Sequence, residues 1–474
     1  MQIPRVPSFR LRKQPLAVGL AVGLAAAMAI PTSANAVPAA ITQHYTGTLA
    51  DGATWVADVP ANYNGTILLF SHGYGPLTAE TQPSYAGDAL LNEGYAVVGS
   101  SYSGITDWAL ASAVRDQFGA LTALEKVIGK AKQTYAIGES MGGLVSSLAN
   151  ERNSGQLDGV LTTCGLVAGG VNLNNYEVDG MYALSELLEP EAGVRLANFA
   201  DPADAKAAAA DLAAIAQQHS GTAQGRARIV LAAALLNMPT WVAGNPKPAA
   251  QDYAAQQAQQ VQLLGGGLFD FLITARQQLE VAAGGNSAFT AGVKYESRLK
   301  DSGYLNEVKA AYQTAGLDLA HDLATLTRNA DISPDPGTIT RLKATSHLSG
   351  RLTVPQINIH TIADELVPVQ HENWYAKRVA TAGRSSLLRQ AYTNTAGHCN
   401  FTSGELIVAL NALIHRVRSG SWGTTTKPAA LNAAAVAGGH GPTAFVTYQP
   451  TPLGGARTNP PVRWVGSRSE HATP

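Results

Sequence analysis

The sequence predicts an α/β fold in which a mostly parallel sheet lies between layers of helices. Short apolar runs at 66–71, 95–101 and 158–164 are typical of parallel strands that are covered on both faces. Helical patterns separate these runs along the chain. A strand, turn and helix layout at Thr134-Tyr-Ala-Ile-Gly-Glu-Ser-Met-Gly-Gly places a glycine two residues before and two residues after one serine.

The elements that precede this serine are assigned from their periodicity. Alternating residues on both sides of a Gly-containing turn at 50–53 predict an antiparallel hairpin. Apolar residues at Val114, Phe118, Leu121 and Leu124 have helical spacing. Up to residue 171, the expected strands are 43–49, 54–59, 66–71, 95–101, a run from 134 and 158–164, and the expected helices are 84–93, 109–128 and the one after the serine.

Between residues 172 and 350 the pattern changes to helices without obvious strands. Expected helices in this segment include 203–218, 226–237, 254–264 and 304–315. Because they are rich in alanine and poor in charge, we interpret the segment as a large helical cap that packs over the sheet. An independent second domain is the alternative.

The sheet pattern resumes after the insertion, with expected strands at 354–360 and 387–392 and expected helices at 372–382 and 405–417. The chain is therefore divided into a signal peptide, a first core part, a cap, a second core part and a Gly/Pro/Thr-rich tail, at 1–36, 37–171, 172–350, 351–419 and 420–474. Most of the tail is expected on the surface or mobile, with local docking at 445–448.

Composition narrows the class of protein. The chain has 474 residues, of which 46% are hydrophobic and 14% charged, so it can bury a large core. A net charge of -1 and the lack of a basic run argue against nucleic acid as a partner. The oligomeric state does not follow from the sequence.

The first residues predict export. Arg5, Arg10, Arg12 and Lys13 precede an apolar run at 16–30, and Ala-Asn-Ala at 34–36 is a small-residue cleavage site. The run is shorter than the roughly 20 residues that span a bilayer, so an uncleaved anchor is the less favoured alternative. Without paired arginines before the run, the general secretory route is expected, and the product is predicted to be secreted without stable membrane insertion.

Gly138-Glu139-Ser140-Met141-Gly142 predicts a nucleophilic serine. The small residues at 138 and 142 allow a sharp turn and close helix packing, which presents the Ser140 hydroxyl at the edge of the sheet. The helix that follows directs its N-terminal dipole toward the place where an oxyanion would form. A chance match among 47 glycines is the alternative.

A serine nucleophile needs an imidazole base and a carboxylate that orients it. Asp364 directly follows the expected strand at 354–360, where the acid belongs, and Glu365 and Asp179 remain alternatives. Of eleven histidines, His398 lies in a Gly-containing loop between the last expected strand and the last helix, and His371 stays open as another base. The others are set aside by position: His44, His72, His219, His321, His347, His360, His415, His440 and His471.

No metal site, phosphate loop or dinucleotide fingerprint is recognised in the sequence, so no metal and no cofactor are expected.

With these residues the sequence resembles the α/β-hydrolases, in particular secreted bacterial serine esterases and prolyl-oligopeptidase-like hydrolases with a helical cap. The resemblance covers about 42–171 and 352–418. It implies that Ser140 is the nucleophile, Asp364 the acid and His398 the base. The turn at His72-Gly73-Tyr74-Gly75 follows the third strand, where such hydrolases place the second oxyanion donor, so the backbone N–H groups of Tyr74 and Met141 are the expected pair.

The step Gly397-His398-Cys399 is also similar to tannases and feruloyl esterases, in which a cysteine after the base pairs with one directly before the nucleophile. Glu139 occupies that second position here. The expected disulfide is therefore between Cys399 and Cys164, which ends a strand near the nucleophile strand, in a chain whose export permits oxidation.

These assignments predict a secreted hydrolase that cleaves a small-molecule or polymeric carboxylic ester through an acyl-enzyme. A serine peptidase or amidase on the same scaffold is the runner-up, and a non-catalytic binding protein is the third possibility. The sequence names neither the acyl group nor the alcohol.

Overall fold

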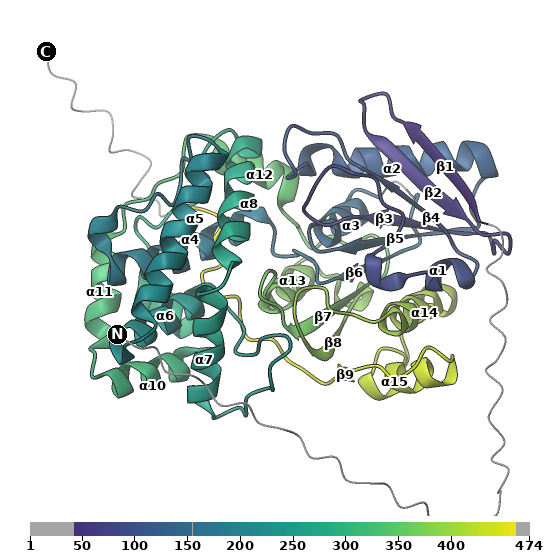
Figure 1. Ribbon diagram of the computed structural model, residues 1–474. Helices are drawn as coiled ribbons and strands as arrows, with labels where there is room; N and C mark the ends of the chain where they lie inside the picture. Colours follow the sequence, from purple (N-terminus) through teal and green to yellow (C-terminus); the bar gives the residue numbers. More distant parts are fainter. Residues whose placement is uncertain (1–41, 154, 461–474) are drawn as a thin grey trace, which may run out of the picture. The chain divides into compact units, whose positions relative to one another are not determined.

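The computed structural model describes residues 42–153 and 155–460 (Figure 1). The expected signal peptide, at 1–36, lies outside the described residues. Within the described ranges, no helix is both long enough and apolar enough to cross a bilayer. The described chain forms a mostly parallel sheet flanked by helices, which confirms the α/β class.

The sheet has nine strands in the order β1-β2-β4-β3-β5-β6-β7-β8-β9. The six strands from β4 to β8 in this order run parallel, while the hairpin β1–β2 and the short β9 are antiparallel at the two edges. The strands are β1 (Gln43–Thr48), β2 (Thr54–Val59), β3 (Thr66–Ser71), β4 (Ala96–Ser100), β5 (Gln133–Glu139), β6 (Gly159–Thr163), β7 (Gln356–Ala363), β8 (Leu388–Ala396) and β9 (Phe445–Val446).

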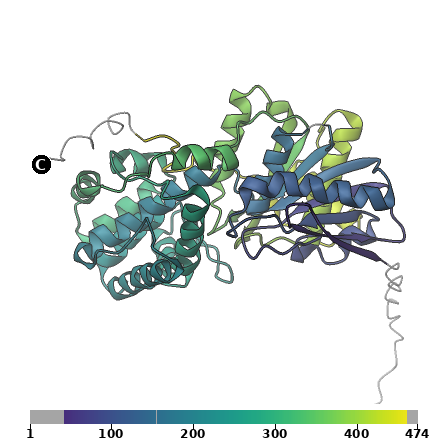
Figure 2. The ribbon, with the colours of Figure 1, turned by 90° about the horizontal axis from the view of Figure 1, so that it is seen from above.

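Helices cover both faces of the sheet (Figure 2). Alternate residues of the central strands contribute to two apolar layers, one on each face. Ile67 and Leu69 of β3 pack with α2 (Leu110–Ile128), α3 (Met141–Glu151) and α13 (Gln370–Thr381). Leu68 and Phe70 pack with the helices of the other face, α1 (Ala89–Asn92), α14 (Ser403–Ser419) and α15 (Pro428–Ala437). All six residues of β3 are buried, as expected for a strand covered on both sides.

One expected helix differs from the structure. The segment 84–93 is a 3₁₀ turn at Ser84–Ala86 followed by the single turn α1. Gly87 separates the two with a φ of 50°, a left-handed conformation that ends a helix.

Helices alone connect β6 to β7. They are α4 (Gly170–Leu188), α5 (Pro202–His219), α6 (Ala223–Leu235), α7 (Tyr253–Leu264), α8 (Leu268–Ala283), α9 (Tyr295–Asp301), α10 (Leu305–Ala315), α11 (Leu319–Asn329) and α12 (Thr338–Ser346), and they share an apolar core of their own. The boundaries 172 and 350 remain a prediction, since α4 begins at Gly170 and packs into both the core beside the sheet and the core of the helical segment.

The helical segment reaches two loops that follow strands of the sheet. Phe271 of α8 packs edge-on against Tyr74, with ring centroids 5.7 Å apart. A Cβ placed on Gly397 would lie 3.4 Å from the Cβ of Ala243, in the loop between α6 and α7. The helices therefore contact the loop after β3 and the loop after β8.

The segment after α14 is largely exposed but is anchored at intervals along its length. Leu431 of α15 is buried beside the sheet. The local docking expected at 445–448 takes the form of a short antiparallel pairing between β9 and β8. Farther along, Gly454 exchanges hydrogen bonds with the side chain of Asn237, and Arg457 pairs with the buried Asp179 of α4. The described tail thus spans from the sheet edge to the helical segment.

Candidate active site

Ser140 occupies the turn between β5 and α3, with φ 54° and ψ −122°. A non-glycine residue in this region is strained and persists only where its surroundings enforce it. A Cβ on Gly138 would lie 2.0 Å from the carbonyl oxygen of Gly142, and one on Gly142 would lie 1.9 Å from that of Ser71. Both positions therefore require glycine, and the turn presents a half-buried serine hydroxyl.

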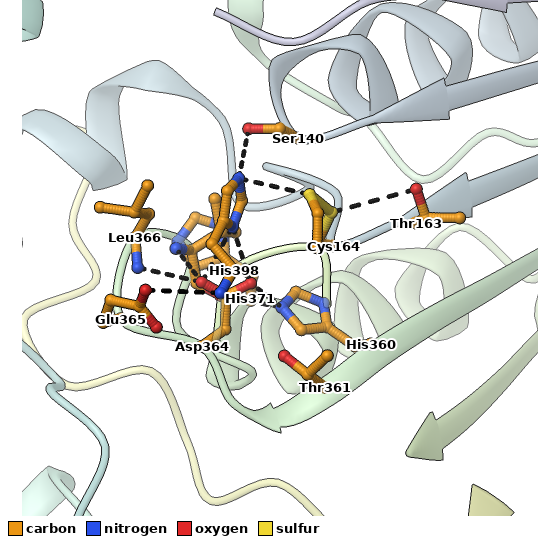
Figure 3. Close-up of polar contacts among 12 residues, drawn as sticks. Ser140, Thr163, Cys164, His360, Thr361, Asp364, Glu365, Leu366, His371 and His398 are labelled. Carbon is orange, nitrogen blue, oxygen red and sulfur yellow. Dashed lines mark hydrogen bonds and ion pairs between the residues drawn. A yellow bond between two sulfur atoms is a disulfide. The ribbon is translucent and has the colours of Figure 1, made fainter. Parts of the chain in front are cut away.

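The structure brings Ser140, His398 and Asp364 into one line of hydrogen bonds (Figure 3). Asp364 follows β7, and His398 lies in the loop between β8 and α14. The Nδ1 atom of His398 is 2.9 Å and 2.8 Å from the two carboxylate oxygens of Asp364. Because a carboxylate only accepts, Nδ1 carries the proton, and Nε2, 2.8 Å from the Ser140 Oγ, is free to accept the hydroxyl proton.

The Asp364 carboxylate is buried and held ionised. Its Oδ1 accepts hydrogen bonds from the backbone N–H groups of Leu366 and Val367, at 2.9 and 2.8 Å. Burial alone would raise its pKa, but His398 and His360 outweigh burial and hold the pKa well below its usual value. The acid is therefore charged throughout the pH range in which an enzyme normally works.

The same carboxylate raises the pKa of His398. Burial of the ring would lower this pKa, but the charge and hydrogen bonds of Asp364, helped by Glu365, exceed that effect, while His360 opposes them. His398 is therefore a stronger base than a free imidazole.

The alternative acids, Glu365 and Asp179, and the alternative base, His371, have other partners than Ser140. Glu365 faces the backbone N–H of His398 at 3.5 Å, and Asp179 pairs with Arg457 and Tyr295. The Nδ1 of His371 accepts from the backbone N–H of Ala168 at 3.2 Å, and burial lowers the pKa of this histidine to about 3. None of these three side chains has a recorded contact with Ser140.

The loop after β3 approaches the serine closely. A Cβ on Gly73 would lie 3.3 Å from the Cβ of Ser140, so the chain passes directly beside the hydroxyl. Buried His72 stacks on Tyr102 at 4.2 Å between centroids, and its Nδ1 donates to the carbonyl oxygen of Gly73 at 2.8 Å. These contacts make His72 a residue that stabilises the turn, as its place in the sequence suggests, and Tyr74, which follows Gly73, lies next to the residue that approaches Ser140.

Two backbone donors near Ser140 are free. Within 42–153 and 155–460, no recorded hydrogen bond uses the N–H of Tyr74. Met141 is the first residue of α3, where an N–H has no acceptor inside the helix. These are the two groups that the sequence proposes as oxyanion donors.

Cys164 and Cys399 form the expected disulfide, with their Cα atoms 5.3 Å apart across a separation of 235 residues. Cys164 directly follows β6, beside β5, and the Sγ of Cys399 lies 3.4 Å from the Nε2 of His398. In the described chain, these cysteines and His398 are the one group with metal-ligand spacing, but sulfur in a disulfide is no thiolate ligand. The bond ties the His398 loop to the centre of the sheet.

His360, one of the histidines set aside by position, is a neighbour of the site. The expected strand ends at residue 360, but β7 continues to Ala363, and the Nε2 of His360 lies 3.5 Å from the Oδ2 of Asp364. The signal that could have indicated it is the spacing to Asp364, four residues later, across the end of β7.

No family model matches the chain. It is 27% identical over 427 residues to an o-phthalyl amidase of Xanthobacter agilis, covering 83% of this chain and 91% of the amidase.

Among solved structures, the chain is similar to feruloyl esterase B from Aspergillus oryzae, with a TM-score of 0.38, 14% identity and coverage of 79% of this chain and 80% of the esterase. An acylaminoacyl peptidase of Pyrococcus horikoshii has a TM-score of 0.33 and 9% identity, with coverage of 76% of this chain, which spans 38% of the peptidase. The sheet order of the present structure, with the serine turn after β5 and a helical insertion after β6, is that of an α/β-hydrolase fold.

Proposed function

We propose that this protein is a serine hydrolase that cleaves carboxylic esters through an acyl-enzyme, with Ser140 as nucleophile, His398 as base and Asp364 as acid. The observation that carries the proposal is the continuous set of hydrogen bonds from the Ser140 Oγ through the His398 ring to the Asp364 carboxylate. Each atom in this set has the donor or acceptor character that proton transfer from the hydroxyl requires.

The reaction follows from these contacts. His398 Nε2 takes the proton of Ser140 as Oγ attacks the acyl carbon, and the new oxyanion accepts from the N–H groups of Tyr74 and Met141. The imidazolium then gives its proton to the leaving oxygen, which departs as an alcohol and leaves an acyl-serine. Water, deprotonated by the same nitrogen, attacks the acyl-serine and restores the hydroxyl with release of the acid.

The amidase relative favours a second candidate, which is hydrolysis of an acyl amide by the same residues. An o-phthalyl amide is the substrate class named for that relative, and the similarity extends over most of both chains. Amide cleavage needs protonation of a poor leaving amine by well-aligned His398, whereas an alcohol leaves readily. We therefore keep the ester as the first candidate and the acyl amide as the second.

The proposal includes export and a substrate-selecting role for the helices. The leader pattern of the sequence and the Cys164–Cys399 disulfide support an oxidising location. Phe271 and Ala243 bring the helical segment to the two loops beside Ser140, which supports its role as a cap over a small-molecule or polymeric substrate.

The test is a matched substrate pair. The ester and the anilide of one acyl group, including an o-phthalyl group, are compared by kcat/KM on wild-type protein and on Ser140→Ala. We expect the ester to react at least about a hundredfold faster, and Ser140→Ala to lose on the order of 10⁶-fold with an unchanged melting curve. Equal constants for the pair would promote the amidase, and a folded Ser140→Ala that retains more than a few per cent of the activity would remove Ser140 as nucleophile.

A further inference from the structure

Behind Asp364 lies a second buried histidine between two carboxylates. His360 of β7 has its Nδ1 3.3 Å from the Oε1 of Glu372, which belongs to α13. Its Nε2 is 2.8 Å from the carbonyl oxygen of Val367 and 3.5 Å from the Oδ2 of Asp364 (Figure 3). The side chains of His360 and Asp364 are fully buried, and that of Glu372 nearly so.

The partners of His360 fix its protons. A carbonyl oxygen can only accept, so the Nε2 that faces Val367 must carry a hydrogen. Glu372 accepts hydrogen bonds at Oε2 from the side-chain amides of Asn358, at 2.9 Å, and Gln390, at 2.5 Å, which suits an ionised carboxylate. Its Oε1 lies 3.3 Å from Nδ1, and an ionised Glu372 makes this atom an acceptor. A ring with acceptors at both nitrogens is an imidazolium.

A neighbouring histidine shows the opposite arrangement. The Nδ1 of His371 faces the backbone N–H of Ala168, which can only donate, so this nitrogen carries no proton. Its Nε2 lies 3.1 Å from the hydroxyl of Tyr176. His371 is therefore neutral, although it lies on α13 next to Glu372 and is equally buried. His360 and His371 can therefore be compared as two equally buried histidines with opposite hydrogen-bond partners.

We propose that His360 is a positioning residue of this site: its buried imidazolium keeps Asp364 ionised and moderates the pull of that carboxylate on the proton of His398. The inference rests on the proposed function, because it assigns a role toward the same base. An uncompensated carboxylate in a buried site is costly, and a cation placed behind it lowers that cost. The same cation repels a second positive charge on His398.

The charges around His360 support this role. The ionisable groups that face it are Asp364, Glu372 and His371 on its own side of the sheet, and His398 beyond Asp364. Burial would lower the pKa of His360, but hydrogen bonds and charges of Asp364 and Glu372 outweigh burial and raise it to about 10. His360 in turn acts against the rise in the pKa of His398.

The first test reads the protonation state directly. The full chain is labelled with ¹⁵N-histidine, and the signals of His360 and His371 are assigned by the variants His360→Gln and His371→Gln. Between pH 6 and 8 we expect both ring nitrogens of His360 to be protonated and only one of those of His371. A neutral His360 ring at pH 7 would overturn the proposal, and this result is independent of whether the protein hydrolyses an ester or an amide.

The second test reads the effect on the base. The acidic limb of the pH profile of kcat/KM is measured for wild type, His360→Gln and, as the matched control, His371→Gln. Loss of the cation should move the limb of His360→Gln upward by about half to one pH unit, while His371→Gln moves it by less than about 0.2 unit. A change in packing alone would lower kcat without moving the limb, and an unmoved limb in folded His360→Gln would contradict the inference.

A double variant keeps the test usable if His360→Gln fails to fold. His360→Gln combined with Glu372→Gln removes both buried charges of the pair and leaves amides that can hydrogen-bond to each other. Replacing a buried pair together is often tolerated where removing one partner is not. We expect an upward movement of the acidic limb that is smaller than in His360→Gln, because loss of the more distant Glu372 anion acts in the opposite direction. A limb at or below the wild-type position would contradict the inference.

Discussion

At the scale of residues, the site depends on a few atoms whose hydrogen-bonding character is fixed by their partners. The Asp364 carboxylate accepts from two backbone N–H groups and from His398, so it orients the ring and raises the pKa of His398. Gly138 and Gly142 let the backbone around Ser140 pack more closely than any side chain would permit, and Gly73 brings the loop after β3 beside the serine. The catalytic geometry therefore depends both on the hydrogen bonds of Asp364 and on the glycines that shape the backbone around Ser140.

The pH dependence of catalysis follows from His398. This base must be neutral to accept the serine proton, and its pKa is raised above 6.5 because Asp364 outweighs the effect of burial. Activity is then full above the raised pKa and is lost as the pH falls through it. We expect the acidic limb of kcat/KM to have its midpoint above pH 6.5, with Asp364→Asn reducing kcat by on the order of 10⁴. A wild-type midpoint below 6.5 would contradict this.

At the scale of elements, two connections hold the base in place. The loop between β8 and α14 carries His398, and the disulfide fastens this loop to the residue after β6. On its outer side the loop meets the helical segment near Ala243. The loop that carries His398 is thus held by the end of β8, by the disulfide and by contact with the helical segment.

Removal of the disulfide should loosen that loop. On the chain-entropy model, closing a loop with a separation of 235 residues stabilises by roughly 5 kcal/mol, and measured values are often smaller. We expect the double variant Cys164→Ser/Cys399→Ser to unfold at lower denaturant and to lose kcat more than it changes KM. Urea unfolding and steady-state kinetics, with and without reductant, check this. Recovery of both cysteines as free thiols from oxidised wild-type protein would rule the bond out.

The helix α8 tests the proposed cap. Phe271 is 41% exposed and its ring packs against that of Tyr74. Val281 of the same helix is 45% exposed and is therefore a control of similar exposure. We expect Phe271→Ala to change the dependence of kcat/KM on acyl length more than the rate on the shortest ester. Val281→Ala serves as the control and should leave the profile unchanged. Identical profiles for the two variants would separate α8 from substrate choice.

At the scale of the whole described chain, the tail joins the sheet and the helical segment. After β9 it runs to Arg457, whose side chain is mostly buried and whose guanidinium bonds both carboxylate oxygens of Asp179. The sequence prediction stopped at local docking, because glycine and proline content indicates irregular backbone and does not reveal where an isolated arginine is bound.

The contribution of the Arg457–Asp179 ion pair to the free energy of unfolding can be measured. Arg457→Ala leaves Asp179 buried without its cation, which should cost about 3 to 5 kcal/mol of unfolding free energy. The control is Arg195→Ala, which removes an ion pair to Asp204 at a largely exposed position and should cost at most about 1 kcal/mol. Thermal or urea unfolding of both variants gives the comparison. Equal, small losses would show that the tail is not held by this pair.

The sequence predicted the parts of the site that local patterns encode. Ser140 stands in a short motif, and Asp364 and His398 follow strands that are recognisable as apolar runs. His360 was missed because the expected strand stops at residue 360, whereas β7 continues to Ala363, and because the role of a buried strand histidine depends on neighbours that the sequence does not show. Glu372, its partner, is twelve residues away on α13. The helix α4 is not among the helices named from the sequence, and its buried Asn175 bonds the backbone of Phe289 and Arg457, contacts that a local pattern does not show.

The most direct measurement of the central claim is covalent labelling by a fluorophosphonate, which reacts with an activated serine hydroxyl. Intact mass and peptide mapping are carried out on wild type, Ser140→Ala and His398→Ala. The account predicts one label per chain, on the peptide that contains Ser140, with loss of hydrolysis in proportion to labelling. Ser140→Ala should take up no label, and His398→Ala should react far more slowly. A stoichiometric label on another residue, or full hydrolysis by a fully labelled protein, would contradict the account.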